Sequence, residues 1–317
     1  MSLLRNLLIL LRPRQWTKNA VCFAGVFFAG HIQVHSALRA CIAAAAFCAA
    51  SGFVYIINDI LDRDRDRLHP HKKLRPIASG QVTVPQALAF SVPVFGLAIG
   101  IAACLGPVVL AIIGCYILLN ICYSAVLKNL SLVDATVVAA GFILRVYAGT
   151  NAVGVTPSAW LLLCTFFLSL FLAFGKRRAE INAASRFDDA EGGSPETAPA
   201  RVPPSGVFEI PRMDSTRGVL HKYNVAMLDR FCNICATLAI AAYALFTVLG
   251  HPNRSFIVTT PPVVMGMFRY LLLVERYHEG EAPDAILLKD WAIQLAILIW
   301  AILYIAVLYG GLHIDVQ

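Results

Sequence analysis

The fold of this chain is decided by residues 84–127, which read VPQALAFSVPVFGLAIGIAACLGPVVLAIIGCYILLNICYSAVL. The stretch contains no charged residue, and an α-helix needs only about 20 mostly apolar residues to cross a bilayer. It is therefore long enough for two crossings. Gly106 and Pro107 divide it, because neither residue suits the interior of a helix. We predict two membrane-spanning helices, over 84–105 and 107–127.

The composition of the whole chain agrees with this reading. Of 317 residues, 58% are hydrophobic and 14% are charged, and the mean hydropathy is +0.70. Soluble domains contain about 25% charged residues, so a soluble globular enzyme, a disordered chain and a disulfide scaffold are excluded. Long uncharged runs dominate over ten-residue alternating segments, which favours helices over a β-barrel. We predict an all-α, polytopic membrane protein, in which the nine cysteines pack as small hydrophobic side chains.

Seven further apolar runs bring the expected number of transmembrane helices to nine. They are 20–34, 40–57, 130–148, 157–175, 231–249, 255–274 and 291–312. The first of them is short and ends in His31 and Gln33. Residues 1–19 are predicted to form an interfacial amphipathic segment anchored by Trp16, and not a signal peptide, because Arg12 follows the apolar core where small residues would be needed for cleavage.

The positions of the positive charges predict the orientation. If the N-terminus lies in the cytoplasm, most of the 26 Lys and Arg residues fall in cytoplasmic segments, as the positive-inside rule requires. The net charge of +7 then reflects topology, and no nucleic-acid partner is expected. We predict one transmembrane domain, 1–317, in the inner (cytoplasmic) membrane, with a flexible Gly/Pro/Ala/Ser-rich cytoplasmic insertion at 186–216.

The polar residues that carry chemistry begin where the second predicted span ends, in the sequence Asn58-Asp59-Ile60-Leu61-Asp62-Arg63-Asp64-Arg65-Asp66. On a helix, Asn58, Asp62 and Asp66 share one face, and Asp59 lies beside Asp62. Like charges at this spacing repel unless a cation neutralises them, and oxygen ligands suit Mg²⁺. We predict a magnesium site formed by Asn58, Asp62 and Asp66. The alternative is a solvated helix end whose aspartates are neutralised by Arg63, Arg65 and Arg67.

Further polar residues gather at the same predicted face of the membrane. Basic groups around carboxylates suit a polyanionic substrate, although each of them also fits plain positive-inside topology. They are Lys72, Lys73 and Arg75 after the aspartates, Tyr123 and Lys128 after the fourth span, and Lys176, Arg177 and Glu180 after the sixth.

Two charged residues are predicted inside the fifth span. Asp134 and Arg145 are eleven residues apart, about three helical turns, and therefore lie on the same face. Intramembrane charges face the bundle interior, a cavity or a partner, so they are either functional or paired with another helix. An ion-coupled transporter could use them, but the charge of this chain concentrates at one membrane face and not at the midplane, which disfavours that alternative.

The motif Asn58-Asp59-x-x-Asp62-x-x-x-Asp66, together with nine spans, resembles the UbiA-type intramembrane prenyltransferase superfamily. Further stretches resemble its polyprenyl-phosphate (decaprenyl-phosphate) phosphoribosyltransferase branch. They are Arg12-Pro13-Arg14-Gln15-Trp16-x-Lys18-Asn19, His69-Pro70-x-Lys72-Lys73-x-Arg75-Pro76-Ile77-Ala78-x-Gly80, Tyr123 with Lys128, Gly175-Lys176-Arg177-x-Ala179-Glu180, and Gly280-Glu281 with Asp284 and Asp290.

The resemblance implies a UbiA-like helical bundle with its polar site on the cytoplasmic side. It implies Mg²⁺ as cofactor, 5-phosphoribosyl 1-diphosphate (PRPP) as donor, and a polyprenyl phosphate as acceptor, in the synthesis of cell-wall arabinan precursors. The expected catalytic residues are Asn58, Asp59, Asp62, Asp66, Tyr123 and Lys128. The expected substrate-binding residues are Lys72, Lys73, Arg75, Arg145, Lys176, Arg177 and Glu180, with Arg14 and Lys18 for the acceptor phosphate.

The resemblance also leaves a second enzyme open. Prenyltransferases of the superfamily carry a second aspartate-rich motif after the sixth span, but here that position, 175–180, is mostly basic. More bases and fewer carboxylates suit a donor with three phosphates and an anionic acceptor. Transfer of a prenyl group from a prenyl diphosphate to an aromatic or quinone-precursor acceptor remains the alternative. The sequence does not fix the oligomeric state, and a homo-oligomer stays open.

Overall fold

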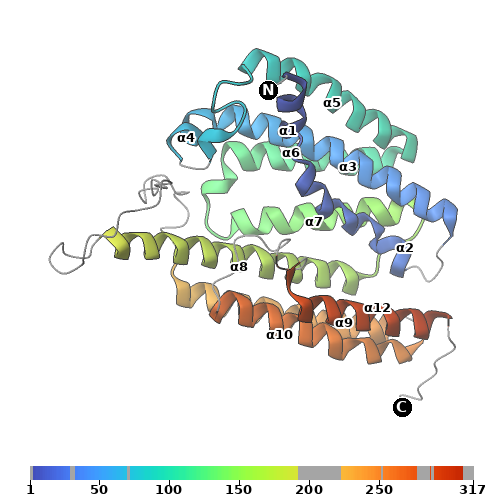
Figure 1. Cartoon of the computed structure of the whole chain (residues 1–317). Coiled ribbons are helices and arrows are strands. Elements are labelled where there is room, and N and C mark those ends of the chain that lie inside the picture. Colours follow the sequence, from blue (N-terminus) through green and yellow to red (C-terminus); the bar gives the residue numbers. More distant parts are fainter. Residues whose placement is uncertain are drawn as a thin grey trace.

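The computed structural model describes residues 3–28, 33–69, 72–191, 223–250, 253–276, 286 and 289–309, with side chains left out at 28, 183–191 and 276. Every regular element in this part of the chain is a helix (Figure 1). The all-α prediction is confirmed. All nine cysteines are free, and Cys232 and Cys235 are buried in one helix, as expected for packing residues.

Among the described residues, eight helical segments are long and apolar enough to cross a membrane, and each corresponds to a predicted span. They are α3 (Val34–Leu61), α5 (Val84–Leu105), α6 (Pro107–Ala125), α7 (Val133–Ala152), α8 (Ala159–Glu191), α9 (Val225–Leu249), η6 (Arg254–Thr259) continued by α10 (Thr260–Arg276), and α12 (Trp291–Tyr309). The predicted break between α5 and α6 falls at Gly106, whose φ of 115° suits glycine, and Pro107 starts α6.

The remaining predicted span, 20–34, which comes first in the chain, is not among these eight. A 3₁₀ helix, η1 (Pro13–Phe23), leads into the short α2 (Ala24–Phe28), while 29–32 lie outside the described residues. Residues 13–19, predicted to be interfacial, therefore belong to this segment, and only α1 (Leu3–Leu10) precedes it. The 3₁₀ helix rises about 2.0 Å per residue against 1.5 Å in an α-helix, so the segment reaches further than its length suggests.

Contacts show that η1 and α2 run the length of the bundle. Arg12, just before η1, binds Asp59 at the end of α3, whereas the carbonyl of Phe27 accepts a hydrogen bond from Tyr304 at 2.8 Å. In between, a Cβ on Gly149 of α7 would lie 2.0 Å from the carbonyl oxygen of Cys22. The backbones of η1 and α7 therefore touch directly, and we refer to residues 13–28 as the first crossing segment, after their path across the helix bundle.

Two of the buried hydrophobic clusters are larger than the others. One lies among α3, α5, α6, α7 and the first crossing segment, around Phe47, Ile113 and Tyr116. The other lies mainly among α8, α9, α10 and α12, around Phe171 and Leu228. Helices α7 and α8 pack together and join the two halves (Figure 1). Helix α8 continues to Glu191, so the start of the predicted flexible insertion, 186–191, is helical, and 192–216 lie outside the described residues.

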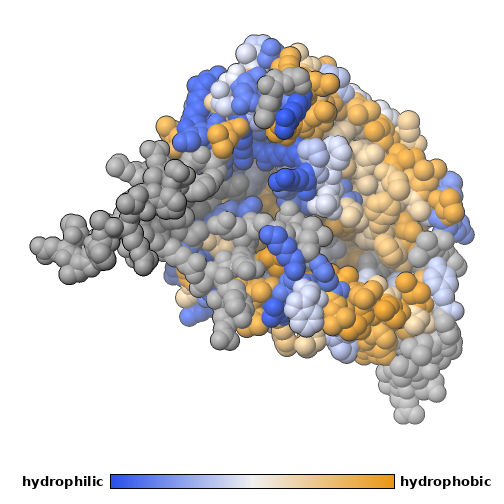
Figure 2. Space-filling model, viewed as in Figure 1, coloured by the Kyte–Doolittle hydropathy of each residue, from blue (hydrophilic) through white to orange (hydrophobic). Residues whose placement is uncertain are grey.

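The short elements α4 (Arg63–Leu68), η2 (Lys72–Leu74) and η3 (Leu127–Asn129) lie at one end of the bundle. Helix α4 and the 3₁₀ turn η2 follow α3, and η3 joins α6 to α7. In space-filling view, hydrophilic side chains surround a hollow at this end, between the two halves of the bundle (Figure 2). The fold thus places the polar segments of the sequence together.

Candidate active site

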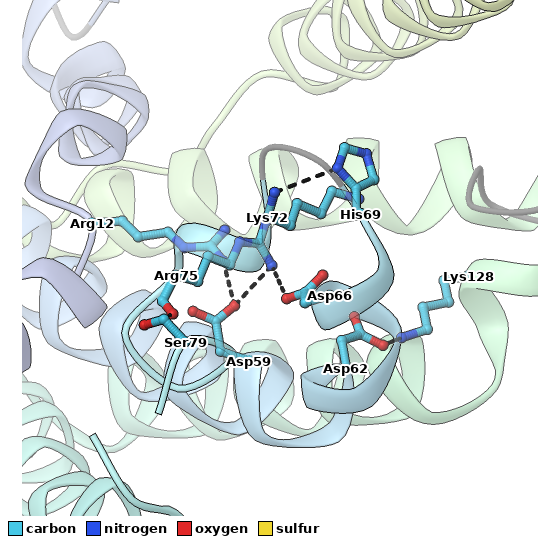
Figure 3. Close-up of polar contacts among 9 residues, drawn as sticks. All are labelled: Arg12, Asp59, Asp62, Asp66, His69, Lys72, Arg75, Ser79 and Lys128. Atoms are coloured by element: carbon cyan, nitrogen blue, oxygen red, sulfur yellow. Dashed lines mark hydrogen bonds and ion pairs between the residues drawn. The ribbon is translucent and has the colours of Figure 1, made fainter. Parts of the chain in front are cut away.

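Three aspartates project from the junction of α3 and α4 toward the same space (Figure 3). Asp62 interrupts the helix as the cap of α3, but the backbone N–H of Asp62 still bonds to Asn58 and that of Asp66 to Asp62, at 2.9 and 2.8 Å. The four-residue spacing is therefore kept across the junction. Asp59 and Asp66 are each 3% exposed, and the side chain of Asp62 is 20% exposed. The three aspartates therefore lie together at this junction (Figure 3).

Each of these aspartates is paired with a base that lies outside α3 and α4. Asp59 accepts hydrogen bonds from Arg12 and, at 3.1 Å, from Arg75. Arg75 also binds Asp66 at 2.6 Å, and Lys128 binds Asp62 at 2.5 Å. Figure 3 shows Arg75 above Asp59 and Asp66, with Lys128 beside Asp62. The repulsion among the carboxylates is thus neutralised by the protein's own cations.

The neutralising bases are not those of the sequence-based alternative. Arg63 and Arg67 instead pair with Asp64, whose side chain is 76% exposed. The hydrogen bond from Arg63 lowers the pKa of the Asp64 carboxyl group, which therefore stays ionised. Asp64 occupies a variable position of the motif, and its exposed side chain takes no part in the cluster's ion pairs.

The donor set fits a magnesium ion only in part. Among the described residues, no three acidic, histidine or cysteine side chains converge closely enough to enclose a metal. In the same part of the chain, however, the ion pairs of Asp62 and Asp66 use one carboxylate oxygen each. Mg²⁺ is often held by one or two carboxylates and completed by water and substrate phosphates. Two hard oxygen donors on one face suit that kind of site.

A second polar cluster lies across the same end of the bundle, at the starts of α7 and α9 and in α8. Asp134 is fully buried and binds Arg177 at 2.9 Å through one oxygen and the hydroxyl of Tyr223 at 3.1 Å through the other. Arg177, 4% exposed, also binds Glu180 at 2.9 Å. Lys176, whose side chain is 45% exposed, lies 4.0 Å from Glu180. Lys176 is therefore the more accessible of the two predicted bases.

Tyr123 and Lys128 link the two clusters. Lys128, in η3, reaches back to Asp62, whereas Tyr123, near the end of α6, lies within electrostatic range of Arg177. The structure therefore brings together the aspartates, Arg75, Tyr123, Lys128 and the Arg177 cluster. Lys72 is half-buried and Lys73 is exposed beside them. On the first crossing segment, Arg14 is exposed and Lys18 is half-buried.

Arg145 lies apart from both clusters, inside the bundle. It donates to Asn19 of η1 and Tyr116 of α6, at 2.8 and 2.9 Å, and also to the carbonyl of Gly141. Asp134 and Arg145 are thus each held by partners on other elements, as the structural alternative predicted. Arg269 is likewise paired with Asp290, at 2.8 Å, and its hydrogen bonds lower the pKa of that carboxyl group. Glu281 and Asp284 lie outside the described residues.

Sequence reasoning missed two residues of this end. Arg12 was part of a recognised motif, but nothing in its spacing linked it to Asp59, which is 47 residues away. Tyr223 follows the insertion and belongs to no motif. The αL backbone of Arg12 (φ 50°) aims its guanidinium over Tyr55 and into the cluster.

Comparison with known proteins identifies related chains. The sequence model of the UbiA prenyltransferase family matches residues 19–293. A decaprenyl-phosphate phosphoribosyltransferase of Corynebacterium glutamicum is 31% identical over 309 residues, covering 94% of this chain and 85% of that protein. One from Mycobacterium tuberculosis is 30% identical over 304 residues, covering 92% and 90%.

A solved structure supports the architecture. A UbiA homologue from Archaeoglobus fulgidus, bound to DMAPP and Mg²⁺, superposes with a TM-score of 0.66 over 97% of this chain and 100% of the other, at 18% identity. At that identity the likeness establishes the fold alone. The bundle described above is therefore shared over its whole length.

Proposed function

The chain belongs to the UbiA prenyltransferase family, and on that premise we propose that it is a polyprenyl-phosphate phosphoribosyltransferase. It moves 5-phosphoribose from PRPP to decaprenyl phosphate and releases diphosphate. The observation that carries the proposal is the identity of about 30% to decaprenyl-phosphate phosphoribosyltransferases over more than nine-tenths of the chain. Prenyl transfer to an aromatic acceptor is the competing activity within the same fold.

The charge of the site supports this substrate pair. Bases pair with every aspartate of the cluster (Figure 3) and also surround Glu180 in the second cluster. These bases balance the carboxylates that they pair with, and Lys72 and Lys73 beside them add positive charge. A donor that carries a diphosphate and a further phosphate, meeting an anionic acceptor, needs such added cations. A prenyl diphosphate meeting a neutral aromatic ring does not. We place the site on the cytoplasmic side of the inner membrane, in agreement with the positive-inside distribution.

In the proposed mechanism, Arg75, Lys72 and Lys73 bind phosphates of the donor. Lys128, beside Asp62, and Lys176, in the second cluster, complete the polar pocket. Asp62 and Asp66, with Asn58, would hold Mg²⁺, which when bound stabilises negative charge on a departing diphosphate. The bond between ribose C1 and the diphosphate oxygen breaks, and its electron pair leaves with diphosphate. An oxygen of the acceptor phosphate forms the new bond to C1. That oxygen is already anionic, so no strong general base is required.

Arg14 and Lys18, at the start of the first crossing segment, are proposed to bind the acceptor phosphate. Both lie near the end of the bundle that carries the aspartates, because Arg12 contacts Asp59. Trp16 is 40% exposed between them, as expected for a side chain at a membrane interface. The acceptor would thus enter with its phosphate at the polar end and its prenyl chain along the apolar helices.

The test is an assay with radiolabelled PRPP, Mg²⁺ and the purified protein in lipid containing decaprenyl phosphate. Label that enters the lipid phase supports the proposed function. Label that stays in water, together with transfer from a prenyl diphosphate to an aromatic acceptor, supports the alternative enzyme. If neither transfer occurs, both the phosphoribosyltransferase and the prenyltransferase hypotheses are wrong, and the ion-coupled transporter is the remaining hypothesis.

Removal of the exposed base of the second cluster is expected to weaken donor binding. Lys176→Ala should raise the dissociation constant of PRPP about ten- to a hundredfold, because a hydrogen bond to a charged group contributes roughly 1.5–3 kcal/mol. Affinity for the lipid acceptor should change much less. Titration calorimetry in detergent measures the two affinities separately. Unchanged PRPP affinity would contradict donor binding by Lys176 and would leave it a role only in the positive-inside distribution of charge.

Removal of Lys128, the base that pairs with Asp62, is expected to strengthen metal binding. Lys128 and a divalent cation compete for the same carboxylate, so Lys128→Met should tighten Mn²⁺ binding, measured without substrate, about tenfold. A tenfold change corresponds to about 1.4 kcal/mol. The interaction energy of two unit charges 4 Å apart near a protein surface is roughly 4 kcal/mol, and structural relaxation and solvent reduce the part of it that the variant loses. Arg65→Met, an equal charge change at an exposed position of α4, should leave the affinity unchanged. Equal effects of the two variants would contradict a shared site.

A further inference from the structure

Tyr223, directly before α9, has a polar environment that its sequence context does not suggest. The residue is 6% exposed. Its hydroxyl oxygen accepts a hydrogen bond from the backbone N–H of Leu132 at 2.6 Å, and the hydroxyl donates to Asp134 at 3.1 Å. Burial raises the pKa of Tyr223 above its usual range. The hydroxyl therefore keeps the proton that it shares with Asp134.

The backbone that Tyr223 contacts is strained. Leu132 has a φ of 66° and, with Arg12, is one of two non-glycine residues with positive φ in the described part of the chain. Such a conformation is unfavourable for a leucine and persists only when its surroundings hold it. Here the hydroxyl of Tyr223 binds the N–H of Leu132, and α7 starts at the next residue. Tyr223 thus fixes the start of α7, where Asp134 lies.

From Asp134 the contacts continue into α8. Both carboxylate oxygens of Asp134 are engaged, one by Tyr223 and one by Arg177. Arg177 also forms an ion pair with Glu180, and the other carboxylate oxygen of Glu180 lies 4.0 Å from Lys176. Exposure increases along this series, from fully buried Asp134 to Lys176 at 45%. The buried members are therefore placed to orient the exposed ones.

We propose that Tyr223 is a positioning residue for the phosphate-binding groups of the donor site. Through Asp134 and Arg177 it fixes Glu180, and Glu180 sets the direction of Lys176. On this view the buried Arg177 orients its neighbours and does not itself contact substrate. The inference rests on the proposed function, since it assigns to Lys176 the phosphates of the donor.

The test is Tyr223→Phe, which keeps the aromatic ring and removes only the hydroxyl. The dissociation constant of PRPP, measured by calorimetry with Mg²⁺, is expected to rise about tenfold, whereas the KM of the lipid acceptor should change less than about twofold. If Tyr223 contributed to stability alone, the variant would have a lower thermal midpoint, but PRPP binding would not be weakened more than use of the lipid acceptor.

Tyr243 provides a matched control. It is also 6% exposed, and its hydroxyl also has two partners, Thr259 and Trp300, each at 2.6 Å. These partners lie on η6 and α12, away from both polar clusters. Tyr243→Phe should lower the thermal midpoint to a similar degree without changing PRPP affinity. Equal PRPP affinities in the two variants would overturn the proposal.

A second variant covers the case in which Tyr223→Phe does not fold. Asp134→Asn keeps the shape of the side chain but weakens its bonds to both Tyr223 and Arg177, and it should also weaken PRPP binding about tenfold. If both residues act through one series of contacts, the double variant should be no weaker than the worse single variant. Additive losses would show independent effects. A wild-type protein that does not bind PRPP would refute the proposed function, whereas PRPP affinity unchanged by these variants refutes only the role of Tyr223.

Discussion

Replacement of Asp62 with asparagine is expected to reduce transfer about a thousandfold while the protein remains folded. The amide has the shape of the carboxylate, but it loses the charge that would hold Mg²⁺ beside the donor diphosphate. A metal that stabilises a departing anion contributes several kcal/mol, and each 1.36 kcal/mol changes the rate tenfold. Lys128 is only 8% exposed, but the side-chain oxygen of asparagine can still accept a hydrogen bond from its ammonium group, so this buried cation keeps a polar partner. The measurement is single-turnover transfer at limiting Mg²⁺.

Asp64→Asn is the control for this variant. Asp64 lies two residues after Asp62, but its side chain is 76% exposed and pairs with Arg63 and Arg67 and not with the bases of the cluster. The same chemical change should leave turnover within about twofold, since such exposed pairs contribute little. Near-normal turnover of the Asp62 variant, or a comparable loss in the Asp64 variant, would contradict the proposal that Asp62 binds Mg²⁺.

Gly149→Ala is expected to prevent the first crossing segment from docking. The added Cβ would lie 2.0 Å from the carbonyl oxygen of Cys22 and 2.8 Å from its Cα, and no rotamer can relieve a contact between backbones. Overpacking of a tight core typically costs 1–3 kcal/mol and occasionally more, and a contact with backbone belongs at the upper end. We expect a loss of about 3 kcal/mol or more, seen as a lower thermal midpoint and poor recovery as a single species in detergent.

The matched control lies on a neighbouring helix. Gly114 is in the middle of α6, and a Cβ there would meet no atom within 4 Å. Gly114→Ala should therefore preserve or raise stability, because alanine favours the helix by up to about 1 kcal/mol. A Gly149 variant as stable as the Gly114 variant would show that η1 and α7 are not in backbone contact.

The helices that could be predicted are those whose signals are local. The uncharged run at 84–127 and the break at Gly106 depend only on neighbouring residues, and both appear in the structure. The common face of Asp62 and Asp66 likewise follows from helical spacing. Such features need no knowledge of tertiary contacts.

The parts that were not predicted depend on distant contacts. The first crossing segment is a 3₁₀ helix whose backbone packs against Gly149, and no pattern within 13–28 encodes that partner. The ion pairs of the site are similar, since Lys128 and Asp62 are 66 residues apart and Arg12 and Asp59 are 47 apart. A cluster of bases in the sequence shows that cations are present, but not which carboxylate each will reach.

The hydrogen bond between Phe27 and Tyr304 joins residues 277 positions apart, and this has a consequence for biosynthesis. The first crossing segment precedes α3, α7 and α12 in the chain, so the ribosome makes it before these partners, and Tyr304 follows Phe27 by 277 residues. The segment carries Lys18 and Asn19, so it is poorly suited to stay in lipid alone. It can complete its contacts only after α7 and then α12 have been made. A segment made early in synthesis is therefore among the last to be fully packed.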